Sequence, residues 1–220
     1  MANTPKKRSS KRFKSKCPNR HEIENGFYLD FEGYKNSLPA LCGYRIGGTG
    51  PVTYVAFTNE LKWAAKDSGI ELKDRHSFYR WLVDEKLKNR VLFAFSEHED
   101  KMLQKMSLPK NPGQAPRKNR LKRYRNVLTI AKRGFKGKTP DNFENSLVNF
   151  CDLAGIPIGE EYGKGEVTKW LSEVKKYSCS KYKWKSAPQS ARDSWQKILN
   201  HNAIDVTRMY DLLASINSLD

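Results

Sequence analysis

The chain has 220 residues, of which 38% are apolar and 11% aromatic, enough to build the core of one folded domain. Forty-one Lys and Arg against 24 Asp and Glu leave a net charge of +17, which favours polyanionic partners, nucleic acid above an acidic membrane surface. No segment reaches the roughly 18 consecutive apolar residues of a membrane helix, and the basic N-terminus lacks the apolar segment of a signal peptide. We therefore expect a cytoplasmic protein without membrane contact, and free thiols at its four widely spaced cysteines.

Residues 1–20 contain eight Lys or Arg and no acid. Such a segment buries too little apolar surface to offset the entropy of ordering it. The composition predicts a disordered basic arm over residues 1–22 and a single folded domain over residues 23–220. The arm would contact phosphates or a protein partner, and the alternative is a solubilising tail.

Residues 27–31, 40–46 and 52–57 have strand-like patterns and are separated by turns that contain Gly or Pro. Three neighbouring strands with short turns predict an antiparallel meander. Residues 59–68 and 76–88 then change to helical spacing, and the apolar run 91–95 predicts a buried strand. A further helix is expected to begin near Ser96 or Glu97.

A basic block without any acid lies between Lys101 and Pro140. A single-sign block of this length indicates contact with phosphates. The candidates that we select from it are Arg117, Lys118, Arg120, Lys122, Arg123 and Arg125. Residues 127–130 fit either a strand or the middle of a helix over 117–133, and we predict a short fifth strand.

Helices are predicted for residues 145–153, 167–176 and 191–216, the last as one long helix or a bent pair. Before it, residues 177–188 interleave aromatic side chains with lysines. Rings beside cations can stack on bases while phosphates are neutralised. The candidates for this role are Lys181, Tyr182, Lys183 and Trp184. The alternative is an amphipathic segment whose aromatic side chains pack inward.

Two motifs place acids beside apolar runs. Side chains at i and i+2 of a strand share a face, so Asp30 and Glu32 point the same way, opposite Phe27, Leu29 and Phe31. Two carboxylates aimed together repel unless a cation lies between them. On the last helix, His201 and Asp205 are four residues apart and share a face beside an apolar stripe. The pattern predicts a carboxylate site for divalent cations, which commonly serve phosphodiester cleavage.

The order and form of three motifs resemble the DEDD exonucleases of the ribonuclease H-like superfamily. The motifs are FYLDFE at residues 27–32, LFAFSEHE at 92–99 and ILNHNAIDV at 198–206. The resemblance is closest to the predicted RNase H-like domains associated with RecB-family nucleases, which have Tyr-Glu in the second motif and Tyr-Asn-x-x-Asp-Val in the third. It covers about residues 27–215. His201 lies four residues before Asp205, the spacing of the subclass that has Tyr at this position.

The resemblance implies an α/β, ribonuclease H-like fold with a central mixed sheet, an antiparallel three-strand meander plus parallel strands, flanked by helices. It implies that Asp30, Glu32, Glu99 and Asp205 hold two Mg²⁺ or Mn²⁺ ions and that His201 is the general base. Glu97 and Asp100 stay open as alternatives for the third acid. The expected function is a metal-dependent nuclease acting on DNA or RNA, a 3′–5′ exonuclease. The alternatives are a structure-specific endonuclease and a catalytically inactive nucleic-acid-binding module on the same fold; the residues do not indicate the oligomeric state.

Overall fold

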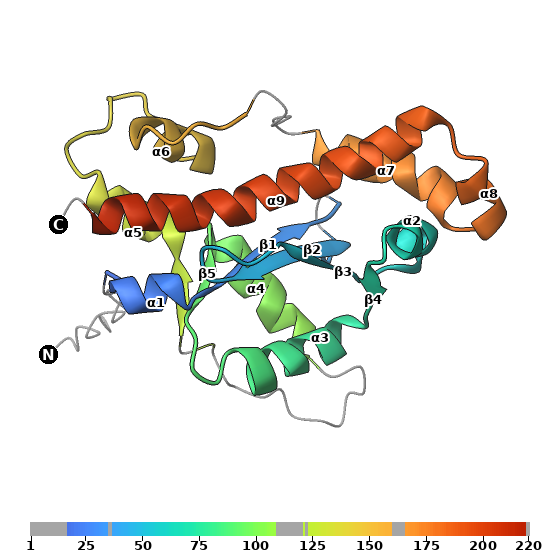
Figure 1. Cartoon of the computed structure of the whole chain (residues 1–220), viewed down its shortest axis with the longest axis horizontal. Helices are drawn as coiled ribbons and strands as arrows, with labels where there is room; N and C mark the ends of the chain where they lie inside the picture. The colour runs from blue at the N-terminus through green and yellow to red at the C-terminus, as the bar shows by residue number, and fades with distance from the viewer. Residues whose placement is uncertain (1–16, 35–36, 109–120, 122, 160–165, 219–220) are drawn as a thin grey trace, which may run out of the picture.

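A six-stranded mixed sheet forms the centre of the computed structural model, which describes residues 17–34, 37–108, 121, 123–159 and 166–218 (Figure 1). The strand order is β4-β3-β2-β1-β5-β6. The first three strands pair antiparallel, β5 and β6 continue parallel to β1, and β4 lies parallel to β3 at the other edge. The expected α/β class and the meander are confirmed. The strands are β1 (Phe27–Glu32), β2 (Leu41–Ile46), β3 (Thr53–Ala56), β4 (Glu71–Leu72), β5 (Leu92–Ala94) and β6 (Tyr124–Asn126).

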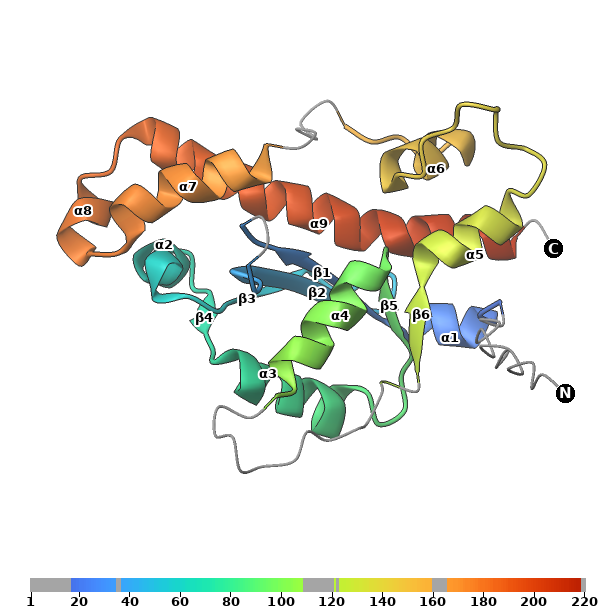
Figure 2. The same cartoon turned by 180° about the vertical axis from the view of Figure 1, so that it is seen from behind.

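Helices cover both faces of the sheet. Figure 2 shows α3 and α4 on one face of the sheet. Helix α9 crosses the other face, and α5, α6 and α7 lie along it. The helical segments are α1 (Arg20–Glu24), η1 (Asn59–Leu61), α2 (Lys62–Asp67), α3 (Arg75–Trp81), the π-helical turn η2 (Leu82–Lys86), α4 (Glu97–Met106), α5 (Val127–Gly134), α6 (Leu147–Leu153), α7 (Val167–Ser178), α8 (Lys181–Lys185) and α9 (Gln189–Asn217).

Strand β1 has the alternation that its sequence predicts. Phe27, Leu29 and Phe31 pack in the apolar cluster under α3 and α4. Tyr28 packs in a different cluster, together with apolar residues of α5, α6 and the C-terminal part of α9. Because side chains of a strand alternate between faces, Asp30 and Glu32 point to the same side as Tyr28. The two acids therefore lie on the face that α9 covers.

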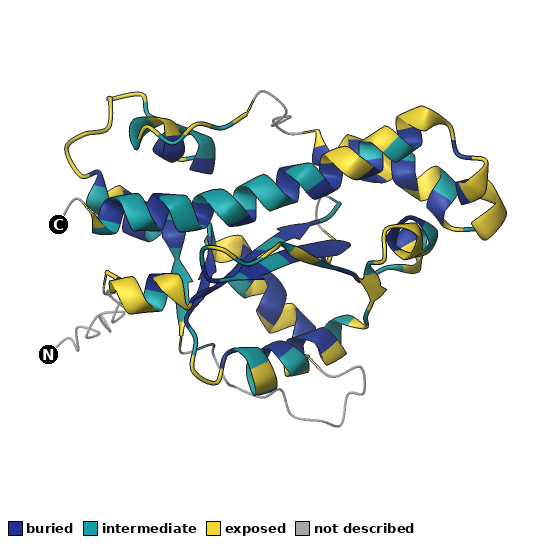
Figure 3. Cartoon of the chain, viewed as in Figure 1, coloured by how far each residue is buried: buried dark blue, intermediate teal, exposed yellow. Residues whose placement is uncertain are grey.

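Helix α9 is one continuous helix of 29 residues, so the long-helix prediction is confirmed and the bent pair is not. Its C-terminal half shares a core with α5 and α6, and its N-terminal half packs against α2, α7 and α8. Trp170, Trp184 and Trp195 fill the second of these cores. Figure 3 shows that α9 is buried or half-buried over most of its length, whereas α7 and α8 have exposed outer faces. The middle of α9 is thereby held over β1 and β2.

The prediction of a strand at residues 127–130 is wrong. The strand β6 ends at Asn126, whose side chain accepts a hydrogen bond from the backbone N–H of Thr129 and so caps helix α5. Val127, Ile130 and Ala131 are buried, which is helical spacing. The β-branched side chains favour a strand locally, and packing against α9 overrides that preference.

The N-terminal boundary also differs from the predicted one. Helix α1 begins at Arg20, inside the range 1–22 that was expected to be a disordered arm, and Asn19 caps it in a capping box with Glu22. Ile23 anchors this helix in the core. Residues 1–16 lie outside the described residues. Cys42, Cys151 and Cys179 are free thiols, as expected. Within the described ranges, no helix combines the length and the apolar character needed to cross a membrane.

Candidate metal centre

Three elements that are far apart in the sequence bring acidic side chains together. Strand β1 contributes Asp30 and Glu32, and α9 contributes His201 and Asp205 from the face that lies over the sheet. Glu99 stands in the first turn of α4, directly after β5. Because β5 is the parallel neighbour of β1, the start of α4 is brought beside the end of β1. The cluster therefore forms where these three elements meet.

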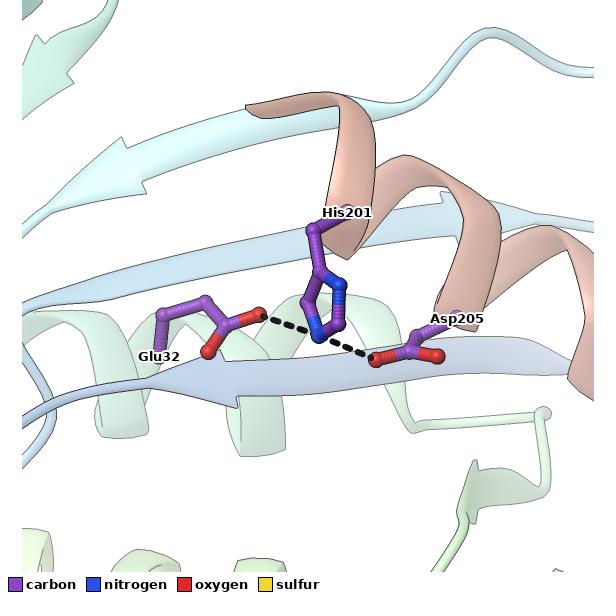
Figure 4. Close-up of side chains that lie close together, drawn as sticks. All are labelled: Glu32, His201 and Asp205. Carbon is purple, nitrogen blue, oxygen red and sulfur yellow. Dashed lines mark ion pairs between the residues drawn. The ribbon is translucent and has the colours of Figure 1, made fainter. Parts of the chain in front are cut away.

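Glu32, His201 and Asp205 form the tightest part of the cluster (Figure 4). One ligand atom from each of the three lies within 4.8 Å of the others. Nε2 of His201 is 3.5 Å from Oδ2 of Asp205 and 4.0 Å from Oε1 of Glu32. Glu32 and His201 are each only 8% exposed. An arrangement of two carboxylates and an imidazole at this separation suits a divalent cation.

Asp30 lies beside this group and is held by α9. Nδ2 of Asn202 donates to Oδ2 of Asp30 at 2.7 Å and to the backbone oxygen of Asp30 at 3.3 Å. Asp30 pairs with Gly43 of β2 in the antiparallel ladder. Both acids of the first motif are thus placed under α9, although Asp30 is outside the tight group of three.

Glu99 is the buried member of the three acids at the start of α4, with 6% of its surface exposed. Its Oε2 accepts hydrogen bonds from the backbone N–H and the hydroxyl of Ser96, so the side chain is fixed by the capping box of the helix. Glu97 is exposed, and Asp100 accepts a hydrogen bond from Gln104. Of the three, Glu99 is therefore the buried acid, and its charge, after burial and the charges of Glu32 and Asp205, contributes to raising the pKa of Asp30.

The electrostatics of the cluster favour a bound cation. Burial, followed by the charges of Glu32, Asp205 and Glu99, raises the pKa of Asp30 well above its ordinary value. Burial and then Asp205 raise the pKa of Glu32 to about 8. Oε1 of Glu32 is buried and accepts no hydrogen bond from the described residues. Carboxylates that repel one another, together with a buried oxygen of Glu32 that has no donor among the described residues, fit Mg²⁺ or Mn²⁺, whose charge offsets the repulsion.

His201 behaves in the opposite way, because burial lowers its pKa. The imidazole is then neutral at neutral pH and can accept a proton. The edge of its ring meets Trp170 of α7, with the ring centroids 6.2 Å apart. This contact and the helix backbone hold the imidazole between the two carboxylates.

A cavity of about 480 Å³ opens directly beside the cluster. Glu32 and His201 line one side, and Tyr34, His98 and Thr168 line others. The cavity gives access to Glu32 and His201 from outside. It mixes polar and apolar walls, as a site for an organic substrate does.

The predicted nucleic-acid contacts divide into three groups. Arg117, Lys118, Arg120 and Lys122 lie outside the described residues. Arg123 is exposed and Arg125 is half-buried on β6. Lys181, Tyr182 and Lys183 are exposed on α8, and Tyr182 is 85% exposed.

The prediction that Trp184 stacks on bases is wrong. Its side chain is 4% exposed and belongs to the core between α7, α9 and α2. Its indole N–H donates to Asp67 at 3.3 Å. Helix α8 buries one face, and Trp184 lies on it. Tyr182, two residues earlier, lies on the exposed face.

Sequence reasoning assigned no role to Asn202 or Gly43. Asn202 is fully buried, four residues after Ile198 and four before Val206, which are both core residues. The sequence did contain a signal for Asn202, namely a polar residue within the apolar stripe of a helix. A buried amide needs a hydrogen-bond partner, so such a residue indicates a specific contact. Its partner is Asp30, which no local pattern connects to position 202.

Comparison with protein-family models, with curated proteins and with solved structures finds no match. The chemistry of this centre therefore has to follow from its own residues.

Proposed function

We propose that this protein is a metal-dependent nuclease that hydrolyses phosphodiester bonds in nucleic acid, and specifically a 3′–5′ exonuclease of the ribonuclease H-like, DEDD type. The observation that carries the proposal is the convergence of Asp30, Glu32, Glu99 and Asp205 with His201. Of these five residues, Glu32 and His201 line the cavity. These side chains come from positions up to 175 residues apart in sequence order, between 30 and 205. A chance grouping of four acids, of which Glu32 and Glu99 are buried and Asp30 and Asp205 half-buried, would be costly without a cation.

The arrangement of the elements supports the same proposal. The meander β1–β3, the parallel strand β5 and the order of the three motifs along the chain agree with what the resemblance implies. Asp30 and Glu32 lie on β1, and Glu99 lies in the first turn of the helix after β5. Asp205 lies on the C-terminal helix. The two-residue strand β4 at the sheet edge is an addition to the sheet that the resemblance implies. Strands β3 and β2 separate it from β1, which carries Asp30 and Glu32.

Asp30, Glu32, Glu99 and Asp205 would hold the two divalent cations. Bound there, Mg²⁺ or Mn²⁺ supplies Lewis acidity and lowers the pKa of water near the scissile phosphate. The chain's own contribution is to fix these oxygens from three rigid elements and to keep them out of bulk water. His201 would accept the proton of the attacking water at Nε2, the ring nitrogen that faces the carboxylates.

A nucleic-acid substrate agrees with the charge of the chain. A net charge of +17 attracts a polyanion strongly, although the acids of the cluster are a penalty in a pure phosphate binder. This combination favours a nuclease over a protein that only binds nucleic acid. The basic side chains would track the backbone of the strand outside the cavity.

The test is degradation of end-labelled single- and double-stranded DNA and RNA with Mg²⁺, Mn²⁺ or EDTA. We expect cleavage only with a divalent cation, and a ladder that shortens from the 3′ end. Asp30→Ala and Asp205→Ala should each lose it. Asp193→Ala is the matched control, because Asp193 is an exposed acid on the same helix α9; it should cleave like the wild type.

Two other results have clear meanings. Internal cleavage at junctions or flaps would replace the exonuclease by a structure-specific endonuclease with the same metal centre. Tight, salt-sensitive binding without cleavage under any metal would contradict the proposal and favour a binding module.

A further inference from the structure

The side chain of Asn202 is wedged between β1 and β2. It has no exposed surface, and it lies over Gly43, the β2 residue that pairs with Asp30. A Cβ atom at position 43 would stand 1.6 Å from Oδ1 of Asn202, far inside contact distance. The amide therefore occupies the space that any other residue at position 43 would fill. The close approach of α9 to β2 requires glycine there.

From this position Asn202 holds Asp30 at two points. Its Nδ2 group reaches both the backbone oxygen and Oδ2 of Asp30, at 3.3 and 2.7 Å. Two contacts to one residue fix the side-chain torsion as well as the place of the carboxylate. Burial raises the pKa of Glu32, and the same amide of Asn202 opposes this rise, so it lies within the field of both acids of β1.

Stability alone does not explain this side chain. Oδ1 of Asn202 is buried and accepts no hydrogen bond from the described residues. A buried amide oxygen without a donor is costly, and the neighbours of Asn202 on the inner face, Ile198 and Val206, are apolar. An apolar residue would suit this stripe better if packing were its only purpose. The donor group of Asn202 serves the two acids of β1, with both of its described hydrogen bonds going to Asp30.

We propose that Asn202 is a positioning residue which, seated on Gly43, aims the carboxylate of Asp30 at the metal centre. The inference rests on the proposed function, because the cation is the group that Asp30 is aimed at. Asn202 holds a ligand and touches no reacting atom. It is the counterpart of the hydrogen-bond partners that orient ligands around metal sites in general.

The experiment compares Mn²⁺ binding to the full chain by electron paramagnetic resonance and calorimetric titration. Asn202→Ala should weaken the affinity by about 10- to 100-fold while the protein stays folded by circular dichroism. Asn200→Ala is the matched control: it lies two residues earlier on α9, and its side chain bonds only Gln196 among the contacts described. It should bind Mn²⁺ like the wild type. Asp30→Ala sets the loss expected when the ligand itself is absent.

The contact with Gly43 gives a sharper test. Gly43→Ala should weaken Mn²⁺ binding as much as Asn202→Ala, because the new Cβ displaces the amide. The double variant should lose no more than either single one, since the removed amide leaves room for the methyl group. Without Asn202 the nearest remaining contact of that Cβ is the ring of Tyr54 at 3.4 Å, an ordinary separation. Additive losses would overturn the interlock between positions 43 and 202.

The results separate this inference from the proposed function. If the wild type binds Mn²⁺ and folded Asn202→Ala binds it equally well, the positioning role is overturned and the metal centre stands. If the wild type binds no Mn²⁺ at millimolar concentration, the metal centre fails and the positioning role fails with it. Parallel losses in Asn202→Ala and Gly43→Ala, with the same EPR line shape in both, support the inference.

Discussion

Burial acts on His201 and on the carboxylates beside it in opposite directions, because it always disfavours the charged form. It lowers the pKa of His201 and raises those of Asp30 and Glu32. At neutral pH the imidazole is then uncharged and able to accept a proton, while the carboxyls retain protons that a cation would displace. A neutral His201 can therefore act as a base although its Nε2 lies within 4.0 Å of carboxylate oxygens of Glu32 and Asp205, the expected metal ligands.

Replacing His201 tests its assignment as the base. His201→Gln should lower the cleavage rate by about 10²- to 10⁴-fold, because proton removal loses its acceptor, while Mn²⁺ affinity changes by only a few-fold. The pKa of His201 lies below its ordinary value of about 6.5, so the cleavage rate of the wild type should rise as the pH increases through this acidic range. The rise should vanish in His201→Gln. Single-turnover kinetics between pH 5 and 8 measure both effects, with exposed His21→Gln as control. A variant that loses Mn²⁺ binding instead would make His201 a ligand.

The acids predict how stability changes with pH. A folded pKa of about 8 for Glu32, above its ordinary 4.5, means that the folded state binds more protons than the unfolded state between these values. Without metal, stability should fall as pH rises through this window, by at most about 1.4 kcal/mol per pH unit for each proton. The lowered pKa of His201 has the opposite sign, a loss as pH falls, and acts only below about 6.5. The interval from pH 7 to 8 therefore isolates the carboxyls.

Urea unfolding at pH 7.0, 7.5 and 8.0 measures this slope. Glu32→Gln should flatten it, and millimolar Mg²⁺ should stabilise the wild type more at pH 8 than at pH 7, because fewer protons have to leave. A stability that is constant over this interval without metal would show that the carboxyls titrate normally.

At the scale of single elements, the sequence predicted what local periodicity determines. The alternation on β1 placed Asp30 and Glu32 on one face, and the stripe on α9 placed His201 and Asp205 on its inner side. It failed at residues 127–130, where a helix packs against α9 despite β-branched side chains. It also missed Asn202, because the partner of its amide comes from another element. Long-range contacts of this kind leave no local pattern.

Helix caps give a matched pair of variants at this scale. Ser96 caps α4 and holds Glu99, whereas the side chain of Asn126 caps α5 through the backbone N–H of Thr129. Ser96→Ala and Asn126→Ala should each cost about 1 kcal/mol of stability. Only Ser96→Ala should also weaken Mn²⁺ binding, because Glu99 loses the hydroxyl that orients it. Denaturant unfolding and metal titration measure the two effects; equal Mn²⁺ affinity in both variants would remove Glu99 from the ligand set.

At the scale of the whole molecule, the helical end formed by α7, α8 and α2 lies at the opposite end of α9 from α5 (Figures 1 and 2). The aromatic side chains of α8 divide there into one core residue, Trp184, and one exposed residue, Tyr182. The composition of this segment predicts affinity for a polyanion. It does not predict which of the two aromatic side chains, Tyr182 or Trp184, is buried. The reason is that five residues of helix show too little periodicity to identify the inner face.

Substitutions on α8 separate binding from stability. Tyr182→Ala should leave stability within about 0.5 kcal/mol and weaken single-strand binding, whereas Trp184→Ala should cost about 3–5 kcal/mol. Lys181→Ala with Lys183→Ala should lower the slope of log affinity against log salt by about 1 to 2. Exposed Lys62 and Lys88, which lie outside both α8 and the basic block, provide the control pair. Fluorescence anisotropy with a labelled oligonucleotide measures the binding, and equal slopes for both double variants would exclude α8 from the interface.

Every function proposed for this protein requires that the acids under α9 form a divalent metal centre. Anomalous diffraction from crystals soaked in Mn²⁺ tests it most directly. We predict anomalous density between Glu32, Asp205 and their acidic neighbours Asp30 and Glu99, and its loss in crystals of Asp205→Ala. Crystals with Mn²⁺ bound elsewhere, or with none at these carboxylates at millimolar concentration, would contradict the account.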